Sequence, residues 1–179
     1  MARRFHDAEQ LLPPATALKR ALAIIYDGLI SIAVLLVTTW AYTMVAGWIN
    51  GWDTYEQMAE AGELSGDPGL TFVLFLVLYL FFAYFWTRIG QTLGMQVWRV
   101  RIENLDGTSV SWTQALIRYI TAAFVVFLTI MGAYYLGSLT LLLTVPAIIA
   151  LFYPINGLSL TDRASSSVVV QVPRPEKKK

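Results

Sequence analysis

The chain has 179 residues, of which 56% are hydrophobic and only 14% are charged, and its net charge is +1. Soluble domains contain roughly 45–50% apolar and about 25% charged residues, so this composition favours a membrane protein. The chain has no cysteine, which excludes disulfide bonds, thiolate catalysis and cysteine-ligated metals. Its single histidine, His6, cannot build a multi-histidine metal site, and its position near the N-terminus favours a solvated side chain.

Gaps in the charge distribution predict the membrane spans. No charged residue occurs between Asp27 and Asp53, from 68 to 87, or from 119 to 161. A helix needs roughly 20 apolar residues to cross about 30 Å of hydrocarbon, so the first two gaps each fit one crossing and the third fits two. The predicted spans are residues 21–49, 69–87, 113–132 and 136–154.

The basic residues predict the orientation of these spans. With four crossings, all 13 lysines and arginines fall on one side. The charged residues of the loop between the first two spans are all acidic. The positive-inside rule places that basic side, with both termini, in the cytosol. Because the basic residues follow the span ends, they give no separate support for nucleic-acid binding. The first twenty residues lack an apolar signal-peptide core, so we expect the first span to be retained.

Shorter elements are predicted between the spans. Alternating residues and an Asp106-Gly107 turn signal predict a small cytoplasmic β-hairpin over residues 97–110, after the second span. Ser111, three residues before Gln114, predicts a capping box that begins the third helix. Asp53 is expected to cap a short helix over residues 56–64 in the outer loop. The serines at 165–167 are typical of a turn, followed by a short valine-rich strand.

An ordered set of motifs resembles the RDD family of bacterial membrane proteins. It comprises Arg20, Asp27, GQTLG at 90–94, NLDG at 104–107 and TDRASSSVVV at 161–170. The resemblance covers roughly residues 15–170. It implies that the arginine and two aspartates for which the family is named are Arg20, Asp27 and Asp162. The supporting residues are Arg118 at the start of the third span and Gly90, Gln91, Thr92 and Gly94 of the glycine-bracketed motif. The chain departs from the family pattern at two places. The family commonly has a basic residue where this chain has Met95, and Gly-Thr-Arg where this chain has Ser166-Ser167-Val168.

Two roles for the charged residues of the first span remain open. Arg20 and Asp27 are about two helical turns, or roughly 10.5 Å, apart on one helix face, too far for a strong direct pair. In one interpretation they join Arg118 and Asp162 in a polar cluster that ties span ends and tail together. In the other, Asp27 is a cation or proton site, since an ionisable residue within a span is a functional hypothesis by default. The depth of Asp27 in the bilayer, which would separate these readings, does not follow from the sequence.

The sequence thus predicts an all-α membrane protein of the cytoplasmic (inner) membrane, with four transmembrane helices and both termini cytoplasmic. The expected organisation is an N-terminal segment (1–18), an RDD-like transmembrane domain (19–170) and a basic tail (171–179). Enzyme signatures such as the Walker loop, Gly-x-Ser-x-Gly and His-Glu-x-x-His are missing, so we expect no enzyme activity, cofactor or metal. A scaffold or accessory membrane component is the favoured function. The alternative, which the reported activity of some family members implies, is a small cation/proton antiporter using Asp27. The expected partners are the lipid bilayer and either a second copy of the chain or another membrane protein, with a monovalent cation or proton in the alternative.

Overall fold

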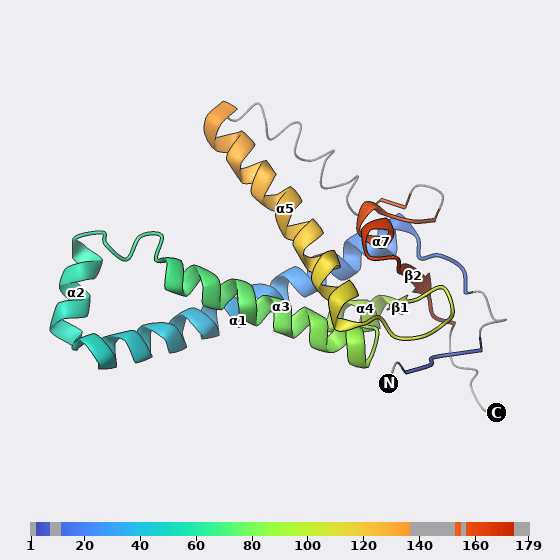
Figure 1. Cartoon of the computed structure of the whole chain (residues 1–179), viewed down its shortest axis with the longest axis horizontal. Helices are drawn as coiled ribbons and strands as arrows, with labels where there is room; N and C mark the ends of the chain where they lie inside the picture. Colours follow the sequence, from blue (N-terminus) through green and yellow to red (C-terminus); the bar gives the residue numbers. More distant parts are fainter. Residues whose placement is uncertain (1–2, 8–11, 137–152, 155–156, 174–179) are drawn as a thin grey trace. The chain divides into compact units, whose positions relative to one another are not determined.

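The computed structural model of the chain describes residues 3–7, 12–136, 153–154 and 157–173. Its elements within these residues form two compact units, Met1–Asp27 with Phe82–Lys179 and Gly28–Phe81, which are taken one at a time below. The elements are shown in Figure 1 and are, in chain order, α1 (Ala17–Asn50), α2 (Trp52–Glu60), α3 (Pro68–Arg88), α4 (Leu93–Trp98), β1 (Val100–Glu103), α5 (Trp112–Leu136), α7 (Leu160–Ala164) and β2 (Val168–Gln171).

Three helical stretches of the described chain are long and apolar enough to cross a membrane. They are Ala17–Asn50, Pro68–Trp98, which takes in α3 and α4, and Trp112–Tyr135. Many of their large apolar side chains are exposed, including Leu29, Leu36, Phe72, Leu80 and Phe124. In water such a surface would be costly, at about 25 cal/mol per Å², so a lipid bilayer is its natural surrounding. The first three predicted spans match α1, α3 and α5, whereas the fourth, residues 136–154, lies almost entirely outside the described residues.

In the unit Gly28–Phe81, the loop before α3 is fixed by Asp67. Its carboxylate accepts hydrogen bonds from the Tyr42 hydroxyl (2.7 Å) and the Gly69 N–H (2.8 Å), so it caps α3, and Pro68 occupies the first helical position. The short helix α2 begins at Trp52, after Gly51 in a left-handed conformation (φ 80°), with no side-chain cap. The prediction that Asp53 caps this helix is therefore wrong. Asp53 lies inside its first turn, where a negative charge favours the helix dipole.

In the other unit, a two-stranded antiparallel sheet organises a small core. Val100 of β1 lies opposite Gln171 of β2, and Glu103 lies opposite Val168. Backbone groups outside the strands cover both edges, because Ile102 N–H donates to the Gly90 carbonyl (2.7 Å) and Ala15 N–H donates to the Val169 carbonyl (2.9 Å). The core beneath consists of Ala15, Ala23, Met95, Val100, Ile102, Val110 and Val169. We call this sheet, with the segments 3–7, 12–16, 89–111 and 157–173 around it, the cap.

The predicted hairpin over residues 97–110 is wrong. Residues 97 and 98 belong to α4, whose first turn is capped by Thr92, and β1 pairs with β2 in place of the residues that follow it. Val169 of β2 supplies a β-branched side chain that packs into the core beside Val100 and Ile102 of β1. The residues after the turn pair instead with the N-terminus, as Ser109 N–H donates to the Arg3 carbonyl (2.7 Å).

Several local signals in the cap are confirmed. Gly107 takes the positive φ (75°) that the turn at Asp106-Gly107 requires. The Ser111 N–H donates to Gln114 Oε1 (2.8 Å) and the Gln114 N–H donates to Ser111 Oγ (3.2 Å), which completes the capping box at the start of α5. A turn at residues 165–166 precedes β2, as the serine run predicts.

Candidate functional site

Asp162 lies at the centre of a buried polar cluster in the cap. It is the third residue of the five-residue helix α7, and it forms a capping box with Ser159. The Ser159 N–H donates to Asp162 Oδ2 (2.9 Å), and the Asp162 N–H donates to Ser159 Oγ (3.3 Å). Only 1% of Asp162 is exposed. These hydrogen bonds within residues 159–162 orient the carboxylate independently of its partners from other helices.

The first partner of Asp162 is Arg20, from the start of α1. Its Nη1 donates to Asp162 Oδ2 at 2.6 Å, joining residues 142 positions apart in the chain. The rest of the guanidinium donates to backbone carbonyls of Ala15 (3.1 Å), Gly157 (3.3 Å) and Val169 (3.2 Å). A planar group with several fixed donors suits this arrangement, and a lysine could not reproduce it. Arg20 therefore ties α1 to α7 and β2 together.

The second partner of Asp162 is Arg118, from the second turn of α5. Its Nη2 donates to Asp162 Oδ1 (2.5 Å), while Nη1 donates to the hydroxyls of Ser167 (2.8 Å) and Ser165 (3.3 Å). The Ser165 hydroxyl in turn lies 2.7 Å from the Thr161 carbonyl, to which it donates. We call the three residues Arg20, Arg118 and Asp162 the clamp. Through the Asp162 carboxylate, the clamp joins the long helices α1 and α5 to the short helix α7.

The clamp explains the acidity of Asp162. Burial raises the pKa of its carboxyl, but the positive charges of Arg118 and Arg20, with the hydrogen bonds from Arg20 and the Ser159 N–H, outweigh that effect. The pKa of Asp162 therefore lies below its ordinary value, and the carboxylate is ionised throughout the physiological range. A permanently charged group fixed by three donors is suited to holding structure and poorly suited to exchanging protons.

Asp27 lies in a separate site, which we call the Asp27 anchor and define as Asp27, Thr92 and Gly94. The Asp27 carboxylate accepts a hydrogen bond from the Thr92 hydroxyl and another from the Gly94 N–H (2.8 Å), and only 7% of Asp27 is exposed. Thr92 is also the N-cap of α4, since its Oγ1 accepts from the Met95 N–H (3.3 Å). The anchor thus holds the first turn of α4 against α1. Among the described residues, no basic side chain contacts Asp27.

The anchor requires a glycine at position 94, because the structure leaves no space there for a side chain. A Cβ placed there would collide with the Ala23 carbonyl oxygen and would lie 2.9 Å from Asp27 Oδ1. The other glycine of the motif, Gly90, has a positive φ of 75°, and Gln91 Nε2 donates to the Val100 carbonyl (2.9 Å). At Gly94 the backbone of the glycine-bracketed motif thus comes close to α1. Gln91 of this motif bonds to β1, whereas Thr92 and Gly94 bond to Asp27.

Removing the hydroxyl of Thr92 is expected to destabilise the protein. Thr92→Val deprives Asp27 of one donor and the Met95 N–H of its cap in a fully buried position, at a cost of about 1–3 kcal/mol. Thr92→Ser keeps the hydroxyl and should retain most of the stability. Thermal unfolding of the purified proteins in one detergent compares the two. Equal midpoints for the valine and serine variants would contradict the anchor.

The single four-residue cluster allowed by the sequence is therefore corrected to two sites. Arg20, Arg118 and Asp162 come together as that interpretation expected, but Asp27 faces Thr92 and Gly94 instead. Sequence reasoning missed Ser159, Ser165 and Ser167 as hydrogen-bonding partners of the clamp, and it interpreted Ser165 and Ser167 only as part of a turn. The described residues contain no group of three or more histidine, aspartate or glutamate side chains arranged to hold a metal ion.

Among known protein families, curated proteins and solved structures, a family match covers most of the chain. No curated protein and no solved structure matches the chain. A family model described as the RDD family matches residues 14–165, a range that includes α1 through α7 with both the clamp and the Asp27 anchor. With that range matched, and with several apolar helices able to span a bilayer, the chain belongs to the RDD family of membrane proteins.

Proposed function

We propose that the protein is a non-enzymatic scaffold or accessory component of the cytoplasmic membrane, with four crossings and both termini in the cytosol. The clamp supports an even number of crossings. Arg118, near the start of α5, contacts Asp162 and Ser167 of the segment 157–173, which supports placing these segments on one side of the membrane. With α5 as a crossing, the chain must cross once more before residue 157, and the apolar residues 136–154 are the ones available.

The orientation is supported by the distribution of charge. The segment from 21 to 87 contains no lysine or arginine, and the loop around α2 carries the acidic residues Asp53, Glu56, Glu60, Glu63 and Asp67. All basic residues belong to the cap, to the ends of helices that lead into it, or to the tail. The positive-inside rule then assigns the cap to the cytosol.

The observation that carries the scaffold role is that the charged groups of the clamp all have bonding partners within the protein. Each charged group of the clamp is bonded to another member, to a backbone carbonyl or to a serine hydroxyl, and Asp162 is almost fully buried. Such a network holds helix ends in fixed positions, since breaking it leaves an uncompensated buried charge. A fixed cap presents a constant surface to a second copy of the chain or to another membrane protein.

A cation/proton antiporter that uses Asp27 is the second candidate. It is favoured by one observation, a buried carboxylate in an apolar helix that contacts no basic side chain of the described residues. Against it, both oxygens of Asp27 already accept hydrogen bonds. A pocket of about 210 Å³ in the cap, lined by residues that include His6, Glu103 and Val168, gives the antiporter no support.

Flux measurements distinguish the two candidates. Purified protein is reconstituted into liposomes that carry a pH-sensitive dye, and proton movement is followed after sodium or potassium is added. We expect the same signal from the wild type, from Asp27→Asn, from Glu60→Gln as an exposed-carboxylate control, and from empty liposomes. A cation-dependent flux that Asp27→Asn abolishes and Glu60→Gln retains would overturn the scaffold proposal in favour of the antiporter.

A further inference from the structure

The N-terminal arm, residues 3–7, is docked on the cap through its backbone. The Phe5 N–H donates to the Gly107 carbonyl (2.9 Å) and the Ser109 N–H donates to the Arg3 carbonyl (2.7 Å), so that Arg4 lies opposite Thr108 in an antiparallel bridge. The arm precedes the matched family range, which begins at residue 14. It therefore lies outside the part of the chain that the family model covers.

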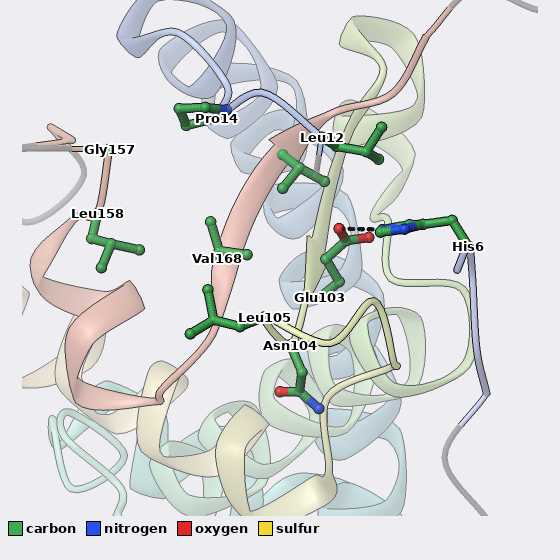
Figure 2. A pocket seen from close by; sticks show the side chains of 10 residues that line it. His6, Leu12, Pro14, Glu103, Asn104, Leu105, Gly157, Leu158 and Val168 are labelled. Atoms are coloured by element: carbon green, nitrogen blue, oxygen red, sulfur yellow. Dashed lines mark hydrogen bonds and ion pairs between the residues drawn. The ribbon is translucent and has the colours of Figure 1, made fainter. Parts of the chain in front are cut away.

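The side chain that fastens the arm is His6. Its Nε2 lies 2.8 Å from Glu103 Oε1 and its Nδ1 lies 2.9 Å from the Asp7 carbonyl oxygen. Figure 2 shows the imidazole directed at the Glu103 carboxylate. Both partners are acceptors, and a neutral imidazole has a proton on only one nitrogen. Both hydrogen bonds can form only when the ring carries two protons, so the docked histidine is the imidazolium ion.

The surroundings of His6 favour this charge. The Glu103 side chain is only 3% exposed and that of His6 is 12% exposed, so water screens the pair weakly. Glu103 Oε2 is occupied by Arg101, through Nε (2.8 Å) and Nη2 (2.7 Å), and the Arg101 guanidinium lies 4.5 Å from the centre of the Phe5 ring. The other charged groups of the arm and of residues 100–109, against which it docks, are Arg3, Arg4, Asp7 and Asp106. Glu103 is thus the one acceptor shared between an arginine and the histidine of the arm.

We propose that the N-terminal arm is a pH-sensitive strap, which protonated His6 fastens to Glu103 and which loss of that proton releases from the cap. His6 and Glu103 also line the pocket of about 210 Å³, together with the apolar residues Leu12, Pro14, Leu105 and Val168 (Figure 2). Release of the strap removes one wall of that pocket and uncovers a buried carboxylate. The expectation that His6 is a solvated terminal residue is therefore wrong.

The direction of the pH dependence follows from the contacts. The hydrogen bond to Glu103, then that to the Asp7 carbonyl, raises the pKa of His6 above its ordinary value near 6.5, although burial and Arg101 act against them. A raised pKa in the docked state means that docking is strongest below the ordinary pKa and is lost as the pH rises through the raised value. The strap is therefore fastened at mildly acidic pH and released at alkaline pH.

Nuclear magnetic resonance of the full chain in nanodiscs tests the protonation directly. His6 is the only histidine, so selective ¹⁵N-histidine labelling gives signals from a single imidazole. We expect two protonated nitrogens at pH 6.5 and a titration midpoint above about 6.5. The midpoint should fall toward that value in Glu103→Gln. A midpoint at or below 6.5 in the wild type would overturn the proposal.

Disulfide trapping tests the docking without disturbing Glu103. The hydrogen bonds that flank Arg4 and Thr108 make them a non-hydrogen-bonded pair, whose Cα atoms are typically about 4.5 Å apart, within disulfide reach. The chain has no native cysteine, so Arg4→Cys with Thr108→Cys reports on this contact alone. Trapping rates are compared with those of the same pair carrying His6→Gln, and their ratio at each pH cancels the shared thiolate chemistry. We expect a ratio of about tenfold at pH 6 that falls to about one at pH 9. A ratio that does not change with pH would contradict the strap.

Discussion

Replacement of Asp162 by asparagine is expected to lower the free energy of unfolding by about 3–5 kcal/mol. The substitution removes the only carboxylate between Arg20 and Arg118, which donate to its two oxygens at 2.6 and 2.5 Å. Two buried guanidinium groups then face each other with a neutral amide between them. The amide can also donate where the clamp needs an acceptor, so the lost attraction is joined by an unsatisfied donor.

The stability of Asp162→Asn is measured by chemical unfolding of the purified protein in mixed micelles. Glu60→Gln is the matched control, because it removes one carboxylate from an exposed position in α2 and is expected to change the free energy by less than about 0.5 kcal/mol. If Asp162→Asn fails to accumulate folded, thermal unfolding in native membranes gives the comparison. An asparagine variant as stable as Glu60→Gln would show that the clamp does not hold the cap.

The same ion pairs predict a pH limit for the fold. Because the pKa of Asp162 is lowered in the folded state, its contribution is fully present above the unfolded value near 3.9 and is lost as the pH falls through the lower folded value. We expect wild-type stability to fall below about pH 4, and this part of the acid dependence should be missing from Asp162→Asn.

The second large effect is expected from Gly94→Ala. The added methyl group would enter the space of the Ala23 carbonyl oxygen and of Asp27 Oδ1, neither of which can withdraw without breaking a hydrogen bond. Overpacking of this kind costs typically about 1–3 kcal/mol, and the loss of the Asp27 contact adds to it. We therefore expect α4 to separate from α1.

Gly28→Ala is the matched control for this substitution. Gly28 lies on the same helix as Asp27. Apart from its chain neighbours and the nearby backbone of its own helix, no described atom lies within 4 Å of a Cβ placed there. The control should be as stable as the wild type or slightly more stable, since alanine favours a helix over glycine. Hydrogen exchange of residues 92–98 measures the separation of α4. Equal protection of that segment in both variants would refute the close contact at Gly94.

Much of the helical architecture could be predicted from the sequence because lipid simplifies the problem. A crossing must be long, apolar and nearly free of charge. The gap between Asp27 and Asp53 therefore locates the charge-free part of α1, and the gap between Asp67 and Arg88 delimits α3, without any tertiary information. Local chemistry was equally readable. The Ser111 capping box and the turn at Gly107 depend only on residues within a few positions of each other.

Contacts between distant segments could not be predicted in the same way. The alternating pattern after Gln96 indicates a strand but not its partner, and β1 pairs with residues about 70 positions later in place of the adjacent ones. Similarly, the sequence places Arg20 and Asp27 on one helix face. In the structure Arg20 bonds to the Asp162 carboxylate of α7, whereas Asp27 bonds to the first turn of α4. His6 looked solvated because Glu103, its partner, is 97 residues away.

A double-mutant cycle on Arg20 and Asp162 tests most directly whether these two charged residues act as one structural clamp. The free energy of unfolding is measured for the wild type, Arg20→Met, Asp162→Asn and the double variant under identical conditions. The clamp predicts strong coupling, with the double variant at least about 2 kcal/mol more stable than the sum of the single losses allows, because removing one partner already strands the other. Losses that add to within about 0.5 kcal/mol would mean that Arg20 and Asp162 act independently, and would contradict the account.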